Sequence, residues 1–306
     1  MIETFHKGEI AVQQKVGEQI MASSVGRIIS DKIPKRVNRF IEEQPMIIVS
    51  STDKFDHIWT SVLFGNIGFT SVLKENTISI EKSNIYSTIT DVFFDNIKEQ
   101  KEIGTLFIEL STRRRFRING TLQLTDSVIE VSVQEAYPNC PKYIQQRVVN
   151  VPKDYKQPKA VIENGTTINQ QIKDWIIQSD TFFIGSKSNN NKLDASHRGG
   201  NKGFIEIIDN TLKIPDYKGN SMYNTLGNIH QNSKAGLLFI DFEKGKILQL
   251  TGKSNLLFEQ NSEEDLIKTG GTGRYLLFNI KKWIKTENHH NIKWDFLSNS
   301  PFNSSF

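Results

Sequence analysis

The sequence contains a single cysteine, Cys140, among 306 residues. One cysteine cannot form a disulfide within the chain, and it cannot build a metal site that needs several thiolates. No run of 18 consecutive apolar residues occurs, so we expect no membrane-spanning helix. The first residues lack a basic segment followed by an apolar core, which argues against a secretory signal and makes the cytoplasm the expected location.

Several motifs of known chemistry are also missing. The chain has no Gly-x-Ser-x-Gly, no Walker loop and no Gly-x-Gly-x-x-Gly fingerprint. The adjacent His289 and His290 have no acid or cysteine at a metal-ligand spacing. A net charge of +4 is too small for the basic stripe of a nucleic-acid-binding protein, although it is compatible with an anionic ligand.

The strongest pattern present is an internal repeat. When the sequence is shifted by 135 positions, residues 40–69 lie over residues 175–204 without a gap, and the Ser61-x-x-x-Gly65-Asn66-x-Gly68-Phe69 pattern falls on identical residues. Further along, the shift is 132, and the run 104–109 (GTLFIE) falls on 236–241 (GLLFID). The chain is therefore predicted to contain two copies of one unit.

Each copy is expected to open with an amphipathic helix. Apolar residues at 33, 37, 40 and 41, and again at 168, 172, 175 and 176, form one helix face. Pro34 is expected in the first turn of the first helix. Thr167 and Gln170 are expected to form a capping box on the second.

Short apolar runs predict the strands that follow. They lie at 46–51, 77–80, 105–110 and 128–133, and at 181–186, 212–214, 237–242 and 247–250. Strands this short and frequent favour barrels over a parallel sheet with crossover helices. We predict a mainly β protein with short helices, whose first domain covers residues 1–150 and whose second covers 151–306. The polar, proline-containing stretch 150–166 is the expected linker.

The two copies differ where an anion could bind. After the shared serine, the first copy continues with apolar residues (62–64, VLF), whereas the second continues with His197-Arg198-Gly199. The loop 215–224 (PDYKGNSMYN) is rich in hydrogen-bonding groups, and a helix is expected to begin near Tyr223. Backbone N–H groups at a helix start, with Arg198 and Lys218 nearby, suit a phosphate monoester.

The first copy contributes an arginine-rich strand at 112–117 (TRRRFR). Because side chains alternate along a strand, Arg113, Arg115 and Arg117 are expected on one face, where they repel one another. One interpretation is a solvated strand with acidic partners such as Glu109. The other is that the strand faces the loop of the second copy and builds one composite anion site per chain.

These segments resemble a known family. The runs 180–186 (DTFFIGS), 194–204 (DASHRGGNKGF), 214–228 (IPDYKGNSMYNTLGN), 236–242 and 248–252 are similar to the pyridoxamine 5′-phosphate oxidase-related FMN-binding split-barrel proteins, in particular their tandem-barrel branch. In the first half, the segments 59–65, 112–120 and 139–144 are similar as well, as is the ending at 294–303.

The resemblance implies two tandem FMN-binding split β-barrels that form a pseudo-dimer, with FMN at their interface, in a chain that is a monomer or a homodimer. Carried over by position, the phosphate side falls on Ser196, His197, Arg198, Lys218, Asn220 and Ser221, and the same loop holds Asp216 and Tyr217. The opposing strand supplies Arg115 and Arg117. Trp59 is a candidate flavin contact, the alternative being a core residue.

The predicted function is an FMN-dependent oxidoreductase that transfers hydride or electrons through its flavin. The alternative is a carrier, sensor or storage protein that binds FMN or another phosphorylated ligand without turnover. Residues 220–222 (NSM) stand where the oxidase proper has a basic pair, so vitamin B6 oxidation is not predicted. Some relatives carry a reductase module after a similar ending, so a separate reductase or a nicotinamide cofactor is the expected electron donor.

Three residues keep more than one interpretation. His197 is a proton donor, a ligand or phosphate contact, or a structural residue. Cys140 is structural, or a thiol activated by Lys142. A haem-binding split barrel would need an axial histidine, for which His57 and His197 are the central candidates, and it ranks below the flavin hypothesis.

Overall fold

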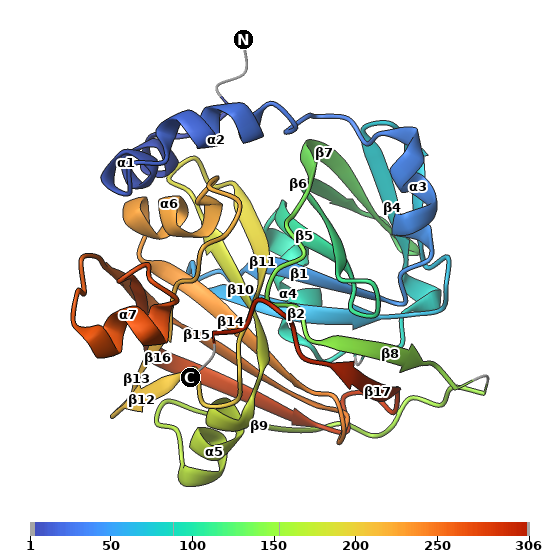
Figure 1. The fold of residues 1–306 in the computed structure, drawn as a ribbon. Helices are drawn as coiled ribbons and strands as arrows, with labels where there is room; N and C mark the ends of the chain where they lie inside the picture. Colours follow the sequence, from blue (N-terminus) through green and yellow to red (C-terminus); the bar gives the residue numbers. More distant parts are fainter. Residues whose placement is uncertain (1–3, 88, 153, 305–306) are drawn as a thin grey trace.

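Two antiparallel sheets with the same strand order make up most of the computed structural model, which describes residues 4–87, 89–152 and 154–304 (Figure 1). The first sheet has the order β2-β1-β5-β6-β7-β4-β3 and the second β11-β10-β14-β15-β16-β13-β12. The first contains β1 (Met46–Thr52), β2 (Ile58–Phe64), β3 (Thr70–Lys74), β4 (Thr77–Glu81), β5 (Glu102–Glu109), β6 (Arg114–Leu124) and β7 (Val128–Pro138). The second contains β10 (Thr181–Lys187), β11 (Leu193–Gly199), β12 (Glu206–Ile208), β13 (Thr211–Pro215), β14 (Lys234–Asp241), β15 (Lys246–Leu257) and β16 (Tyr275–Glu287).

Short helices and a small third sheet complete the structure. A two-stranded sheet pairs β8 (Gln146–Asn150) with β17 (Lys293–Ser298). The helices are α1 (Lys7–Lys15), α2 (Gln19–Gly26), α3 (Lys35–Glu42), α4 (Val92–Glu99), α5 (Gln170–Gln178), α6 (Asn224–Gln231) and α7 (Glu263–Thr269), with a 3-10 turn at Lys82–Asn84. In the described residues, no helix combines the length and the apolar character needed to cross a membrane.

The bounds of the elements follow the sequence repeat. β1 and β10 are related by the shift of 135 residues, as are β2 and β11, while β5 and β14, and α4 and α6, are related by the shift of 132. Corresponding strands also occupy corresponding places in their sheets. The predicted fold class, mainly β with short helices in two related split-barrel halves, is confirmed.

Two local predictions are wrong at the helix starts. Pro34 is the N-cap of α3 and not part of its first turn. The N-cap of α5 is Asn169, whose Oδ1 accepts a hydrogen bond from the backbone N of Ile172 at 2.9 Å. Asn169 takes this role in place of Thr167 because it directly precedes the first helical residue, where a side-chain oxygen reaches the free N–H groups of the first turn.

The expected linker contains a strand. Residues Val161–Gly165 form β9, which pairs antiparallel with β16. Gly165 is required there because a Cβ atom at this position would lie 2.8 Å from the Trp283 ring. The polar composition of 150–166 therefore did not exclude strand pairing at an exposed sheet edge.

Each sheet has its own apolar core, and a third core joins the two sheets. This shared core includes Ile48 and Leu106 from the first sheet and Phe183 and Leu238 from the second. Two glycines related by the repeat let the sheets approach closely, since a Cβ atom on Gly104 would lie 2.7 Å from the Asp194 backbone, and one on Gly236 would lie 2.4 Å from the Ile58 carbonyl oxygen.

Helix α1 packs against α6 (Figure 1). Gly8 of α1 and Gly227 of α6 form the contact, because a Cβ atom on Gly8 would lie 2.2 Å from the Gly227 carbonyl oxygen. Glu9 is buried in this contact, where its Oε2 accepts a hydrogen bond from the His6 backbone N at 2.8 Å and its Oε1 accepts one from Asn224 Nδ2. The start of α6 is thus held against α1.

Candidate anion-binding cleft

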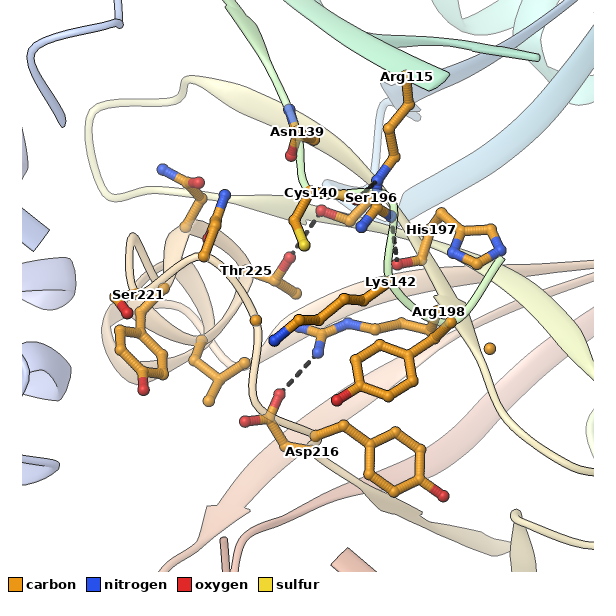
Figure 2. Close-up of a pocket in the computed structure, with 18 of the residues that line it drawn as sticks. Arg115, Asn139, Cys140, Lys142, Ser196, His197, Arg198, Asp216, Ser221 and Thr225 are labelled. Atoms are coloured by element: carbon orange, nitrogen blue, oxygen red, sulfur yellow. Dashed lines mark hydrogen bonds and ion pairs between the residues drawn. The ribbon is translucent and has the colours of Figure 1, made fainter. Parts of the chain in front are cut away.

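A cleft between the two sheets brings together most of the predicted site residues (Figure 2). β6 supplies Arg115 and Arg117 from the first sheet, and β11 supplies residues 196–199 from the second. The loop before α6 forms the opposite wall, and the segment 139–143 after β7 forms the rim. The cavity measures about 100 Å³.

Arg115 is a cation of the cleft whose hydrogen-bond partners are carbonyl oxygens. Its Nε donates to the Cys140 carbonyl oxygen at 2.6 Å, and its Nη1 lies 3.4 Å from the His197 carbonyl oxygen. In the described part of the chain, no carboxylate lies within ion-pair distance of its guanidinium. Burial, together with the nearby Arg117 and Arg198, lowers the pKa of Arg115 to about 9. An anion bound here would relieve this unfavourable burial of positive charge.

Arg117 is, in contrast, fully engaged by the protein. It is buried and pairs through Nε with Asp194 Oδ1 at 2.8 Å. Its Nη1 donates to the Tyr137 hydroxyl at 2.8 Å and to Asn224 Oδ1 at 3.2 Å, and its Nη2 donates to Ser196 Oγ. Arg117 therefore orients Ser196 and the first residue of α6, and adds positive potential to the back of the cleft.

Arg198 reaches across the cleft to the loop before α6 (Figure 2). Its Nη1 lies 2.6 Å from Asp216 Oδ1, and its side chain is 25% exposed. The second oxygen of Asp216 accepts a hydrogen bond from Nε of Arg274 at 3.0 Å. Arg198 is thus in the predicted position, but Asp216 holds it.

The remaining predicted loop residues line the cleft or its rim. Ser196 Oγ accepts a hydrogen bond from Thr225 Oγ1 at 3.0 Å, and Asn220 and Ser221 line the wall. Tyr217 stacks on Tyr143, with ring centroids 4.9 Å apart.

Lys218 stands apart from these loop residues. Its side chain is exposed and does not line the cleft, while its carbonyl oxygen accepts a hydrogen bond from the Tyr143 hydroxyl at 3.1 Å. The predicted loop cation is therefore outside the enclosed part of the site.

His197 presents its backbone, and not its imidazole, to this region. Its ring turns away from Asp216 and Thr225 in Figure 2 and packs edge-on against Phe183, with centroids 5.6 Å apart. Neither ring nitrogen has a hydrogen-bond partner. Burial, with the charges of Arg115 and Arg198, holds the pKa of His197 well below its usual range, so the ring is neutral at pH 7 and is a poor proton donor.

Three other sequence candidates lie away from the cleft. The prediction of three arginines on one strand face is wrong for Arg113, because it occupies the turn before β6 with φ 58° and donates to the Ile144 carbonyl oxygen at 2.8 Å. Trp59 is buried in β2 and donates from Nε1 to Asp53 at 3.2 Å. His57 pairs with the same Asp53 at 2.9 Å. The side chains of Trp59 and His57 therefore meet at Asp53, in the turn that joins β1 and β2.

The rim segment 139–143 was not among the predicted binding residues. The rim consists of Asn139, Cys140, Lys142 and Tyr143. The backbone N of Asn139 donates to the Arg115 carbonyl oxygen at 3.2 Å, which extends the pairing of β7 with β6 and brings this segment to the cleft. The position of this segment directly after a strand paired with the arginine strand was the available signal. In the described residues, no group of three or more histidine, cysteine or acidic side chains could hold a metal ion.

The corresponding place in the other half has Ile247 and Gln249 at the positions of the two cleft arginines. Gln249 stands where Arg117 stands in the cleft, and its Nε2 donates to Ser61 Oγ at 2.8 Å. Ser61 in turn donates to the buried Asp91 at 2.7 Å. Phe64, at the position of Gly199, contacts the His290 ring in a tilted arrangement, with centroids 4.4 Å apart. The two related places are therefore unequal, and the cleft carries the arginines.

Comparisons with known proteins add little to this geometry. No family model matches the chain, and no curated protein matches it. Among solved structures, a HupZ variant from Group A Streptococcus is similar at 14% identity and a TM-score of 0.32, over 39% of this chain and 98% of that one.

Two further solved structures are similar to parts of the chain. An FMN-binding protein from Syntrophomonas wolfei matches at 14% identity and a TM-score of 0.28, over 37% of this chain and 81% of that one. A pyridoxinephosphate oxidase family protein from Clostridium acetobutylicum matches at 14% identity and a TM-score of 0.28, over 42% and 92%. Scores this low carry no argument about the function of this chain.

Proposed function

We propose that this protein binds FMN in the cleft, with the phosphate against Arg115, and uses the flavin for redox chemistry. The observation that carries the proposal is Arg115, a guanidinium without a carboxylate partner beside Arg117, Arg198 and Lys142. The flavin itself is favoured by the residue pattern of 194–228, which resembles the phosphate side of the split-barrel flavoproteins.

The residues present fit a phosphate group. Guanidinium groups bind phosphate strongly, and Arg115 lines the cleft without a carboxylate partner among the described residues, whereas Ser196 Oγ and Thr225 Oγ1 are hydrogen-bonded to each other. A cavity of about 100 Å³ accepts a phosphate but is smaller than the ~300–1,000 Å³ of complete small-molecule sites. The rest of the flavin would therefore occupy the open mouth between the two halves, residues 1–150 and 151–306.

The chemistry would come from the cofactor, since FMN supplies hydride or electron transfer when bound. The chain's own contribution is positive potential from Arg115 and Lys142, which favours negative charge on a ligand in the cleft. Cys140, Lys142 and the Tyr143 hydroxyl are side-chain groups at the rim that carry a transferable proton. A separate reductase or a nicotinamide cofactor is the proposed electron source.

Replacing Arg115 tests the phosphate contact. Arg115→Met should weaken FMN binding by about 1.5–3 kcal/mol, the value of one lost hydrogen bond to a charged group. Arg114→Met is the matched control, since Arg114 is an exposed neighbour on the same strand that lies over the Phe40 ring at 4.6 Å. Equal FMN affinity in both variants would contradict the assignment of the phosphate to Arg115.

The redox part has its own test. The absorbance spectrum of the protein as purified shows whether flavin is present, and anaerobic addition of NADH or NADPH shows whether that flavin is reduced. Reduction followed by reoxidation by an added acceptor supports the oxidoreductase. Bound flavin that no nicotinamide cofactor or reductase reduces would favour the alternative, a flavin carrier or sensor.

A further inference from the structure

We propose that Asp216 and Arg274 form an ionic latch on Arg198 and that this latch sets the affinity of the cleft for anions. In this arrangement Asp216 is an internal competitor for Arg198, and Arg274, which lies outside the cleft, is a positioning residue. The inference rests on the proposed anion binding, but it makes predictions that inorganic phosphate can test without FMN.

The two arginines contact different oxygens of one buried carboxylate. Arg198 Nη1 lies 2.6 Å from Oδ1 of Asp216, and Arg274 Nε lies 3.0 Å from Oδ2. The Asp216 side chain is 6% exposed and that of Arg274 is 9% exposed, whereas that of Arg198 is 25% exposed and borders the cavity. Arg198 is therefore the partner that an incoming anion can reach.

Asp216 and Arg274 are also joined through their backbones. The backbone N of Asp216 donates to the Arg274 carbonyl oxygen at 3.0 Å, and Thr272 Oγ1 donates to the Asp216 carbonyl oxygen at 2.7 Å. Arg274 ends a glycine-rich turn in which Gly273 has φ 57° and would place a Cβ atom 2.7 Å from the Gln260 carbonyl oxygen. This turn fixes Arg274 against Asp216, so the pair behaves as one unit while Arg198 is attached at one point.

The shared carboxylate makes the exchange of partners possible. If Arg198 turns to an anion in the cleft, Asp216 remains paired with Arg274. Without Arg274, the same movement would leave a buried carboxylate with no cation, a situation that is strongly unfavourable. Arg274 therefore weakens the hold of Asp216 on Arg198 without touching the anion.

Substitutions at the two positions should have opposite effects. Asp216→Asn frees Arg198, and we expect phosphate and FMN to bind about 10-fold more tightly, the lower bound for one hydrogen bond to a charged group. Arg274→Met leaves Arg198 as the sole partner of Asp216, and we expect binding to weaken by a similar factor of about 10. Arg274→Lys keeps the charge and should stay close to the wild type.

The double variant separates the latch from simple charge effects. If Asp216 and Arg274 act only through their distant charges, their effects on binding add. If Arg274 acts through Asp216, Arg274→Met should have almost no effect once Asp216 is Asn, and the double variant should bind like Asp216→Asn.

The experiment is isothermal titration of the full chain and these variants with inorganic phosphate, and separately with FMN, at constant ionic strength. Opposite single effects that do not add support the latch. Additive effects, or equal affinities in all variants, overturn it. Phosphate binding that follows the latch pattern without any FMN binding would refute the proposed cofactor and leave the latch supported. If no variant binds either anion, both proposals are wrong.

Discussion

Replacing Glu9 by Gln should remove a loss of stability that the wild type shows as pH rises. Glu9 is 5% exposed between α1 and α6. Burial is the main cause that raises its pKa to about 8, and the carboxylates of Glu135 and Asp194 act in the same direction. The hydrogen bonds from His6 and Asn224 offset only part of this shift.

The sign follows from proton linkage. In the unfolded chain the Glu9 carboxyl ionises with a pKa near 4.5, whereas in the fold it keeps its proton up to about pH 8. The folded state therefore holds more protons between these two values, and stability falls as pH rises through the window. The slope has an upper limit of about 1.4 kcal/mol per pH unit, or roughly 3–5 kcal/mol over the whole window. Such a loss is a large fraction of an ordinary domain's stability.

Urea denaturation at pH 5, 6, 7 and 8 measures this difference. Glu9→Gln should lie close to the wild type at pH 5 and become progressively more stable than it toward pH 8, with unchanged m-values. Glu99→Gln, at an exposed position of α4, is the control and should follow the wild type throughout. Parallel curves for the wild type and Glu9→Gln between pH 5 and 8 would refute the assignment of a buried, protonated Glu9.

Two further predictions concern packing and acid stability. Gly227→Ala would place a Cβ atom 2.6 Å from the Glu9 backbone, so it should release α1 from α6 despite the better helix propensity of alanine. Limited proteolysis measures the release: we expect faster cleavage near residue 15, and an unchanged cleavage rate would contradict the prediction. Burial lowers the pKa of His289 to about 3 and that of His290 to about 4, so both are neutral in the fold. Their contribution is present above pH 6.5 and is lost as pH falls toward 4, because the unfolded chain takes up the protons first. In His290→Phe, the urea midpoint should depend less steeply on pH between 6.5 and 4.5 than in the wild type. A loss of stability as steep as that of the wild type would contradict the prediction.

Strand positions were largely predictable because each apolar run that predicts a strand occurs in both copies of the repeat. A short apolar run such as 46–51 is ambiguous alone, but its counterpart at 181–186 follows the same kind of helix at the same distance. The start of β5 and the end of β6 were harder to predict, since the pairing of Glu102 with Thr121 extends β5 beyond its apolar run, and β6 continues to Leu124. Tertiary pairing, and not local composition, sets those ends.

The cleft was predictable in part, for a similar reason. Differences between the copies pointed to Arg115 and Arg198, which the structure brings to one cavity. The orientation of His197 was also within reach, because alternation along β11 places Ser196 and Arg198 on one side and the imidazole on the other. Arg274 was not predictable, since it meets Asp216 only through a turn far along the chain.

Titration of the wild-type protein with FMN and with riboflavin isolates the contribution of the phosphate, because the two ligands differ only in that group. Phosphate binding by the arginines of the cleft predicts one FMN per chain, since the other half has Ile247 and Gln249 at the positions of Arg115 and Arg117. It also predicts riboflavin binding weaker by at least about 10-fold, which corresponds to the loss of one or more hydrogen bonds to charged groups. Two FMN per chain, equal affinities for both ligands, or no binding of FMN at all would contradict it.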